Sequence, residues 1–362
     1  MKSTLNFPFY AKYAFIVIGG VATVFILFIG QQIILPLIYA TIIAILLNPL
    51  VNFLTKHRLN RIFAIFISVF VTILFTIGLI WFLSVQISLL SETYPQLKVK
   101  FNQTSVQLIH WISEKFNIRT YKIHAWINAT NEDIVRNLGG SIGQTVSTIN
   151  SVIIIVVLLP VYLFMILYYK NLLLQFVNKL FKSSQQPEVY EVLINSKNII
   201  QSYLSGLLIE AAIIAVLNST GLLILGIDYA IILGVTGALL NVIPYVGGVI
   251  AIALPMIIAF ITKDSITAPL MVMGVYLAIQ FIDNHFIIPS IVAAKVKINA
   301  LVSVVVVLVG AALWGIPGMF LSIPLTAILK LIFDHIEPLK PWGFLLGNVV
   351  PTSKLNFGFI KK

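Results

Sequence analysis

The sequence predicts an all-α polytopic integral membrane protein with broken or re-entrant helical hairpins in its C-terminal half. The 362-residue chain is 59% hydrophobic and only 10% charged, whereas soluble domains carry about 25% charged residues. Its mean hydropathy is +1.03. Uncharged apolar runs of membrane-crossing length recur along the chain, and glycine and proline interrupt the later runs. These observations together favour a bundle of membrane helices over soluble domains.

Composition and motifs exclude several classes of function. The chain has no cysteine, which rules out disulfides and thiolate metal sites. The net charge of +11 is typical of basic residues that flank membrane spans, because no basic run with interleaved aromatic residues indicates nucleic-acid binding. The histidines lack metal-ligand spacing, and the chain has neither a phosphate-binding loop nor a nucleophile elbow. We therefore expect no metal, no cofactor, no nucleic-acid partner and no enzyme activity.

Four uncharged runs in the first half predict membrane spans, since about 20 apolar residues cross the hydrocarbon core. The third run is long enough to tilt or to project past the lipid, and Pro160 predicts a kink in the fourth. The first run is interpreted as an uncleaved anchor, because no cleavage pattern follows it and the second span begins at once. The four predicted spans are Tyr13–Gly30, Ile33–Leu54, Ile62–Leu90 and Ile149–Tyr169.

The distribution of lysine and arginine predicts the orientation of these spans. Basic residues precede the first span, join the second to the third, and follow the fourth. Cytoplasmic connections carry such an excess, so we expect both termini in the cytoplasm and residues 91–148 on the opposite face. Within that loop, Thr130 is a plausible N-cap for a helix with an apolar stripe at Ile134, Leu138, Ile142 and Val146. The predicted helix rests on the membrane or on the spans, or it binds a partner.

The second half of the chain folds back on itself. Asn198–Thr262 carries only Glu210 and Asp228 as charges and would rise about 98 Å as one helix, so it has to reverse more than once. The uncharged run Ile298–Leu329 would rise about 48 Å, which is too long for one untilted span. A turn at Gly315–Gly318 makes this run a hairpin of two short spans or a re-entrant dip.

Two similar interruptions point to a transport site. Residues 237–248 read GALLNVIPYVGG and residues 310–318 read GAALWGIPG. A helix broken at membrane depth leaves backbone polar groups that cost several kcal/mol each unless protein or a wet cavity satisfies them. Paired interruptions of this kind mark the binding sites of transporters. The predicted pathway residues at these turns are Pro244, Tyr245, Gly247, Gly248, Gly315, Pro317 and Gly318.

Polar residues within or beside the apolar runs complete the predicted pathway. Glu210 lies midway in an apolar run. A carboxylate in hydrocarbon costs free energy, so such a residue is taken first as a candidate functional group. It either exchanges a proton or binds solute, or else it is a protonated group bonded across a helix pair. Gln280, Asp283 and Asn284 either line a site or cap a span. Asn241 either satisfies the backbone opened by Pro244 or faces the solute.

Two segments resemble the autoinducer-2 exporter family. GIDYAIILGVTGALLNVIPYVGG resembles the family's Asn-x-Ile-Pro-Tyr segment, and the region from Gln280 to Leu329 resembles its C-terminal signature. The chain departs from the family in having Asp283 where glutamate is expected, Ala300 where proline is usual, and an extra proline at 317. Glu210 also matches no family acid. These departures leave the solute more open than the fold.

The resemblance implies a bacterial inner-membrane protein with about eight spans, cytoplasmic termini and re-entrant hairpins. It further implies a homo-oligomer, with a pentamer as one candidate, and export of a small hydrophilic solute such as autoinducer-2. Other members resemble sodium/proton antiporters, which makes H⁺ or Na⁺ a candidate partner.

We therefore expect a secondary transporter that works by alternating access in the bacterial inner membrane. The alternatives are a Na⁺/H⁺ antiporter on the same fold and a membrane scaffold protein. Residues 1–90 would form three scaffold spans, and residues 91–148 an extracytoplasmic amphipathic insertion. Residues 149–197 would form the fourth span and a cytoplasmic connection. Residues 198–340 would form the transport unit with its two hairpins, and residues 341–362 a cytoplasmic tail.

Overall fold

A computed structural model of the chain describes residues 8–116, 157–244, 246–263, 265, 267–291 and 296–348. These residues form helices joined by short connections, and their one isolated β-bridge joins Ile298 to Gly347. Six of the described helices are long and apolar enough to cross a membrane, or seven if one bent pair is also counted as a span. The predicted all-α membrane fold is confirmed.

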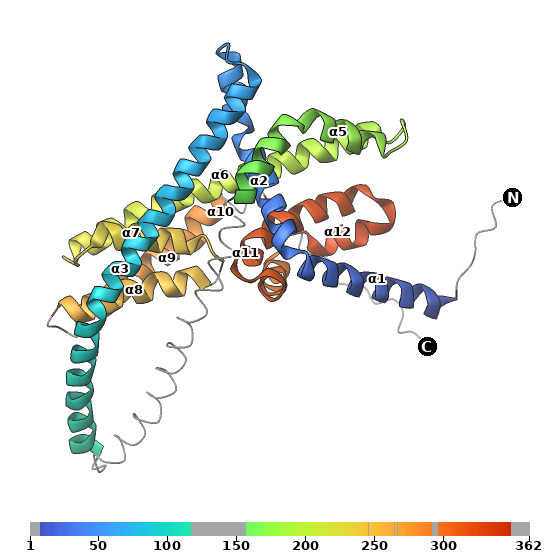
Figure 1. The fold of residues 1–362 in the computed structure, drawn as a ribbon. Coiled ribbons are helices and arrows are strands. Elements are labelled where there is room, and N and C mark those ends of the chain that lie inside the picture. Colours follow the sequence, from blue (N-terminus) through green and yellow to red (C-terminus); the bar gives the residue numbers. More distant parts are fainter. Residues whose placement is uncertain are drawn as a thin grey trace, which may run out of the picture.

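The first three helices correspond to the first three predicted spans. They are α1 (Phe9–Ile29), α2 (Gln31–Lys56) and α3 (Arg61–Phe116). The third helix continues well past the predicted end of its span. Its 56 residues correspond to about 84 Å of helix, far more than a bilayer needs. Figure 1 shows α3 running diagonally past the rest of the bundle, with its far end projecting beyond it.

The fourth predicted span is described from Val157 onward. The helix Val157–Tyr168 is followed by α5 (Lys170–Lys179) at a bend of 67°. The bend therefore lies at Tyr169, after the proline at which a kink was predicted. No side chain of α5 is buried, and polar residues at both of its ends and at Gln175 flank its apolar stretches, as expected for a segment that leaves the bundle. The predicted helix at Thr130 and its apolar stripe lie outside the described residues.

The second half reverses direction repeatedly, as predicted. A long helix, α6 (Gln186–Ile224), precedes the short pair α7 (Ala230–Asn241) and α8 (Val246–Thr262). The chain then returns through a composite helix made of α9, a π-helical turn η1, and α10. The remaining elements are α9 (Thr267–Ile282), η1 (Asp283–Ile287), α10 (Ile288–Ile291), α11 (Ala300–His335), η3 (Glu337–Leu339) and α12 (Lys340–Leu346).

Both interrupted segments are helical hairpins. The backbone of α11 breaks at Gly315, where φ is 64° and ψ is −144°, and its two arms fold against each other. A Cβ placed on Gly310 would overlap the carbonyl of Gly318, and one on Gly247 would overlap the carbonyl of Leu240. The hairpin predicted at Gly315–Gly318 is present, and α7 and α8 form a second one.

Six or seven of the described helices pass the length test, beside the about eight spans implied by the family resemblance. The 12 residues of α7 rise about 18 Å, which is short of a hydrocarbon core about 30 Å thick. The helix α11 passes the length test as one helix although it folds back at Gly315. The two arms of the α7–α8 hairpin are shorter apolar helices, and the two arms of α11 pass the test as one.

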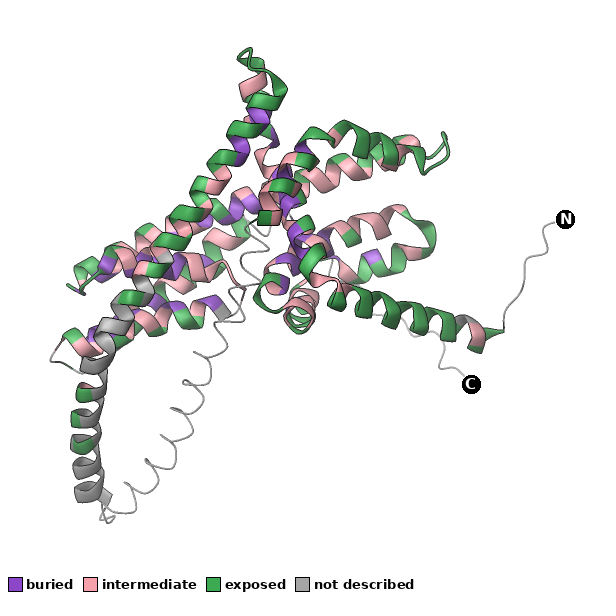
Figure 2. Ribbon diagram, in the orientation of Figure 1, coloured by how far each residue is buried: buried purple, intermediate pink, exposed green. Residues whose placement is uncertain are grey.

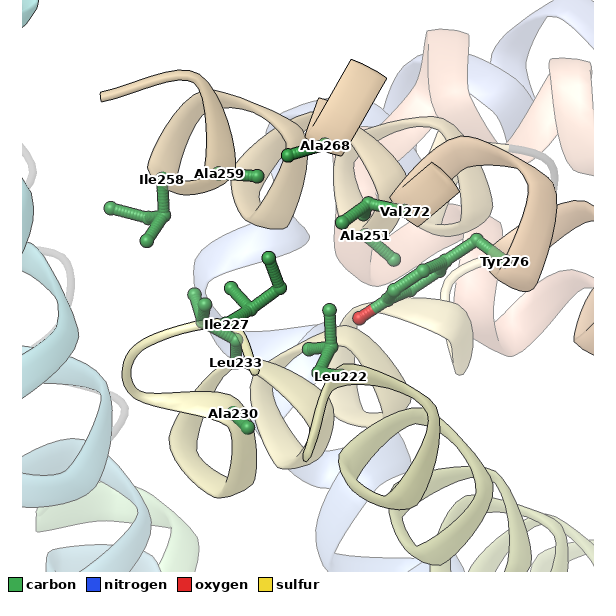
Figure 3. Close-up of a cluster of buried hydrophobic side chains, with 10 residues drawn as sticks. All are labelled: Leu222, Ile227, Ala230, Leu233, Ala251, Ile258, Ala259, Ala268, Val272 and Tyr276. Atoms are coloured by element: carbon green, nitrogen blue, oxygen red, sulfur yellow. The ribbon is translucent and has the colours of Figure 1, made fainter. Parts of the chain in front are cut away.

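Three clusters of buried apolar side chains hold the helices together. The first joins α2, the middle of α6 and α11, and the second joins the end of α6 to α7, α8 and α9 (Figure 3). The third joins α2, α3 and the helix Val157–Tyr168. Figure 2 shows that the outer faces, and nearly all of α1, are exposed. These outer faces are rich in leucine, isoleucine and phenylalanine, as expected for surfaces that face lipid.

Candidate functional site

The helix α6 connects two separately packed bodies, and Glu210 lies between them. Residues Ile200, Leu204 and Leu207 pack into the first cluster, whereas Leu222 packs into the second. Glu210 occurs between these stretches and is only 5% exposed. A carboxylate at such a junction is surrounded by apolar packing on both sides along its helix, where its desolvation is costly.

A cavity of about 580 Å³ opens beside Glu210. We call it the central cavity. Its volume is within the range of about 300–1,000 Å³ that small-molecule sites occupy. Helices α6, α7, α8, α9 and α11 all contribute to its wall, together with η1. Six of the residues predicted to lie on the pathway line it: Glu210, Asn241, Pro244, Gly248, Gln280 and Asn284.

The tip of the α7–α8 hairpin forms one wall of the central cavity. The helix α7 ends at Asn241, and α8 begins at Val246. Proline at 244 has no N–H and stops α7 from continuing. Two turn hydrogen bonds close the tip: the Ile243 N–H donates to the Leu240 carbonyl at 2.9 Å, and the Gly247 N–H donates to the Ile243 carbonyl at 3.0 Å. The end of one helix and the start of the next therefore lie together at the cavity.

Gly247 and Gly248 allow this tip to close. A side chain at Gly247 would collide with the backbone of Leu240, so only glycine permits the two arms to approach this closely. A Cβ at Gly248 would lie 3.4 Å from the side-chain oxygen of Gln280 and 3.6 Å from that of Asn241. The glycine thus leaves two amide side chains open to the cavity.

Asp283 lies behind the wall of the central cavity and is bonded to a residue of that wall. It begins η1, directly after α9, and its side chain is 0% exposed. The amide Nδ2 of Asn241 donates to its Oδ2 at 2.9 Å. Its other oxygen, Oδ1, has no hydrogen-bond partner among the described residues. A π-helical turn is rare and is frequent at functional sites, and here it displaces Asp283 and Asn284 from the regular register of α9.

The two buried carboxyl groups interact. Glu210 lies within electrostatic range of Asp283 and of Tyr203. The Glu210 carboxyl forms no hydrogen bond to any residue that the structure describes, and it faces the cavity. Such a pair can exchange a proton, attract a cation, or accept hydrogen bonds from a hydroxyl-bearing solute.

The tip of the second hairpin lies elsewhere. The Tyr39 hydroxyl of α2 donates to the Pro317 carbonyl at 3.1 Å, and Trp314 Nε1 donates to the Leu27 carbonyl of α1 at 3.0 Å. Gly318 packs against Gly310. Gly315, Pro317 and Gly318 therefore do not line the central cavity, which α11 reaches only through its arms. Tyr245 lies outside the described residues.

Sequence reasoning missed several residues at this site. Tyr203 shares the Glu210 face of α6, and this helical spacing was a usable signal. Ser303 and Ile323 come from the two arms of α11, so only the hairpin geometry brings them to the cavity. A separate group of buried oxygens without partners among the described residues, on Asn218, Thr236 and Tyr276, lies in the second body.

Comparison with known proteins decides the family. The model of the AI-2E family transporters matches residues 14–337, which is most of the chain. The chain belongs to the AI-2E transporter family. This member is therefore a multi-pass membrane transporter and not an enzyme, and the predicted family resemblance is confirmed.

Its relatives are bacterial proteins of similar length. It is 24% identical over 323 residues to "Putative transport protein YueF" of Bacillus subtilis, covering 86% of each chain. It is 25% identical over 323 residues to "AI-2 transport protein TqsA" of Escherichia coli, covering 88% of this chain and 91% of that protein. The bacterial origin of these relatives favours the cytoplasmic membrane for this transporter. The similarity covers both bodies and the cavity between them.

Proposed function

We propose that this protein is a secondary transporter that exports a small polar solute similar to autoinducer-2 across the bacterial inner membrane. The observation that supports this most strongly is the central cavity. Glu210, Asn241, Gln280 and Asn284 converge there from four elements at a break in the α7–α8 hairpin. Amide and carboxyl groups of this kind hydrogen-bond hydroxyl groups, and the relative TqsA is named for autoinducer-2 transport.

Alternating access follows from the two packed bodies. The body of α7, α8 and α9 has its own apolar cluster, as does the body of α2 and α11. The central cavity lies between them, so movement of one body against the other would expose the cavity to each side in turn. In this proposal the body of α7, α8 and α9 is the part of the transport unit that moves, α11 stays packed on the scaffold of residues 1–90 through α2, and both termini are cytoplasmic.

Transport by the purified protein in proteoliposomes tests this function. Vesicles that contain the wild-type chain should accumulate autoinducer-2 faster than empty vesicles. Replacing Glu210 with glutamine should lower the rate at least about tenfold, the equivalent of one lost hydrogen bond to a charged group. Asp228→Asn is the matched control, because Asp228 is exposed and lies outside the cavity. Equal transport by wild-type and Glu210→Gln vesicles would contradict the role of the cavity.

A Na⁺/H⁺ antiporter is the second candidate, and the pairing of Glu210 with Asp283 favours it. Two neighbouring carboxyl groups, one in the wall of a membrane cavity and one buried behind it, can bind H⁺ or Na⁺ in competition. A sodium gradient should then drive proton movement, measured with a pH-sensitive dye inside the vesicles. Glu210→Gln and Asp283→Asn should both abolish the signal. If the protein transports autoinducer-2 but a sodium gradient drives no proton movement, the antiporter is contradicted and the exporter remains.

A further inference from the structure

A second cavity of about 450 Å³ lies along the same face of α6. Its α6 lining residues are Asn195, Asn198, Ile199 and Ser202, whereas Tyr203, Leu207 and Glu210 line the central cavity. Steps of three and four residues place all of these positions on one stripe of the helix. The two cavities therefore follow each other along α6.

Burial changes along this stripe in one direction. Asn198 and Lys297 are exposed at the second cavity, whereas Tyr203, Leu207 and Glu210 are buried at the central one. The second cavity thus reaches the surface, whereas the α6 wall of the central cavity is buried; the exposed residues of the central cavity, Val249 and Asn284, come from α8 and η1.

Val296 stands between the two cavities. Among the residues that the structure describes, it alone lines both of them, and it is 7% exposed. Its side chain packs into the apolar cluster of α2, α6 and α11. The next residue, Lys297, lines only the second cavity, and Ile298 lines only the central one.

The polar lining of the second cavity differs from that of the central cavity. Lys330 forms an ion pair with Asp334, whereas Lys297 has no carboxylate partner among the described residues. Two amides and a hydroxyl from α6 complete the wall. The second cavity is therefore net basic, whereas the central cavity contains the carboxyl group of Glu210.

We propose that the second cavity is a vestibule that binds the solute before it reaches the central cavity, and that Val296 is the apolar constriction between them. This inference rests on the proposed transport function, because it assigns the route by which the solute arrives.

A small neutral solute with several hydroxyl groups suits both sites. Amides and an ammonium group bind hydroxyls in the vestibule, and an anion would be held there and repelled by the deeper carboxyls. The excess of basic residues before α6 and near both ends of α11 favours the cytoplasmic face for its mouth.

The absence of cysteine from the chain permits a direct test. Ser202→Cys places a thiol in the vestibule, and Ser303→Cys places one in the central cavity. Inside-out vesicles expose the cytoplasmic face to a membrane-impermeant methanethiosulfonate reagent. We expect the thiol at 202 to react at least about tenfold faster than the thiol at 303, and faster with the anionic reagent than with the cationic one. Lys297→Gln should remove this preference for the anionic reagent.

Widening the constriction should connect the cavities. Val296→Ala should raise the labelling rate of Ser303→Cys at least about tenfold and leave that of Ser202→Cys unchanged. Val307→Ala is the matched control, because Val307 is a valine of α11 that is 2% exposed and lines neither cavity. If Val296→Ala fails to fold, Val296→Thr keeps the shape, admits water, and should give the same direction of change.

Two results would overturn the inference. One is equal labelling of the thiols at 202 and 303 when residue 296 is valine. The other is a thiol at 303 that stays unreactive in both folded variants of Val296. Labelling requires no transport, so these results are distinct from a failure of the vesicles to carry autoinducer-2. If the thiols label as expected but the protein transports no autoinducer-2, the proposed route stands and the proposed solute is wrong.

Discussion

At the scale of single residues, the contact between Asn241 and Asp283 explains how a carboxyl group is tolerated at membrane depth. Each has a defined place: Asn241 ends α7 at the hairpin tip, and Asp283 begins the π-helical turn. The hydrogen bond between them satisfies one carboxyl oxygen and ties the hairpin to the composite helix of α9 and α10. The same bond orients Asn241, which also lines the cavity.

Removal of the Asn241 amide should therefore destabilise the protein. Asn241→Leu leaves a buried carboxyl with no partner on either oxygen, which costs about 1–3 kcal/mol. We expect a lower unfolding temperature in detergent, measured by intrinsic tryptophan fluorescence. The double variant Asn241→Leu/Asp283→Leu should recover much of the loss, because no polar group is then left unpaired. A double variant as unstable as the sum of the two single variants would show that the bond contributes nothing.

The sequence predicted these residues from their chemistry but not from their contacts. Glu210, Asn241, Gln280 and Asn284 stood out because polar groups are rare in apolar runs, and all four line one cavity. The bond from Asn241 to Asp283 spans 42 positions in the sequence, and no local pattern reports such a contact. Val296 carried no signal at all, because a valine in an apolar segment is indistinguishable from a core or lipid-facing residue.

At the scale of elements, the two hairpins depend on glycine for different reasons. At Gly247 the requirement is space, since a side chain would overlap the Leu240 backbone. At Gly315 the requirement is conformation. Its φ of 64° and ψ of −144° belong to a region that is accessible essentially to glycine alone, while nothing lies within 4 Å of its would-be Cβ. The two hairpins can therefore be perturbed separately.

Close packing at the α7–α8 tip predicts a large effect of one methyl group. Gly247→Ala should lower stability by about 1–3 kcal/mol, the range of overpacking, and distort the cavity wall. The matched control is Gly274→Ala in α9, where nothing lies within 4 Å of the added Cβ. That change should be neutral or stabilise by about 0.5–1 kcal/mol, because alanine favours helix more than glycine does. Thermal unfolding of both variants in detergent provides the comparison, and equal unfolding temperatures would contradict the predicted tip geometry.

The break in α11 predicts a different signature. Gly315→Ala should cost about 1–3 kcal/mol through backbone strain alone, with no steric clash. Because the second hairpin tip lies away from the central cavity, solute binding to the central cavity should change little. Binding measured by isothermal titration, alongside unfolding temperature, separates the two effects. A loss of binding without a loss of stability would place this tip on the pathway after all.

The hairpins themselves were predictable from sequence, whereas their roles were not. Repeated glycine and proline in apolar runs indicated two turns, and both are present. The similarity of GALLNVIPYVGG and GAALWGIPG suggested that both tips face the solute. In the structure only the first tip lines the central cavity, because α1 and α2 provide hydrogen-bond partners for the second. Such partners come from the start of the chain and leave no mark in the local sequence.

At the scale of the whole molecule, the two apolar bodies joined by α6 are the basis of the proposed transport mechanism. A membrane protein gains no hydrophobic driving force from burying apolar helices away from lipid, so close packing and small residues decide which helices move together. One cluster unites α7, α8 and α9 with the end of α6, and another unites α2 and α11 with its middle. The all-α fold and the fold-back of the chain were predicted from composition and length, but this division required the contacts.

The most direct test of the central claim is transport of autoinducer-2 by the purified chain in proteoliposomes. The central cavity predicts uptake that Glu210→Gln lowers at least about tenfold and that Asp228→Asn leaves unchanged. Variants should be compared at equal amounts of folded protein, checked by unfolding temperature. Uptake at the wild-type rate by folded Glu210→Gln protein would contradict a route through the cavity beside α6.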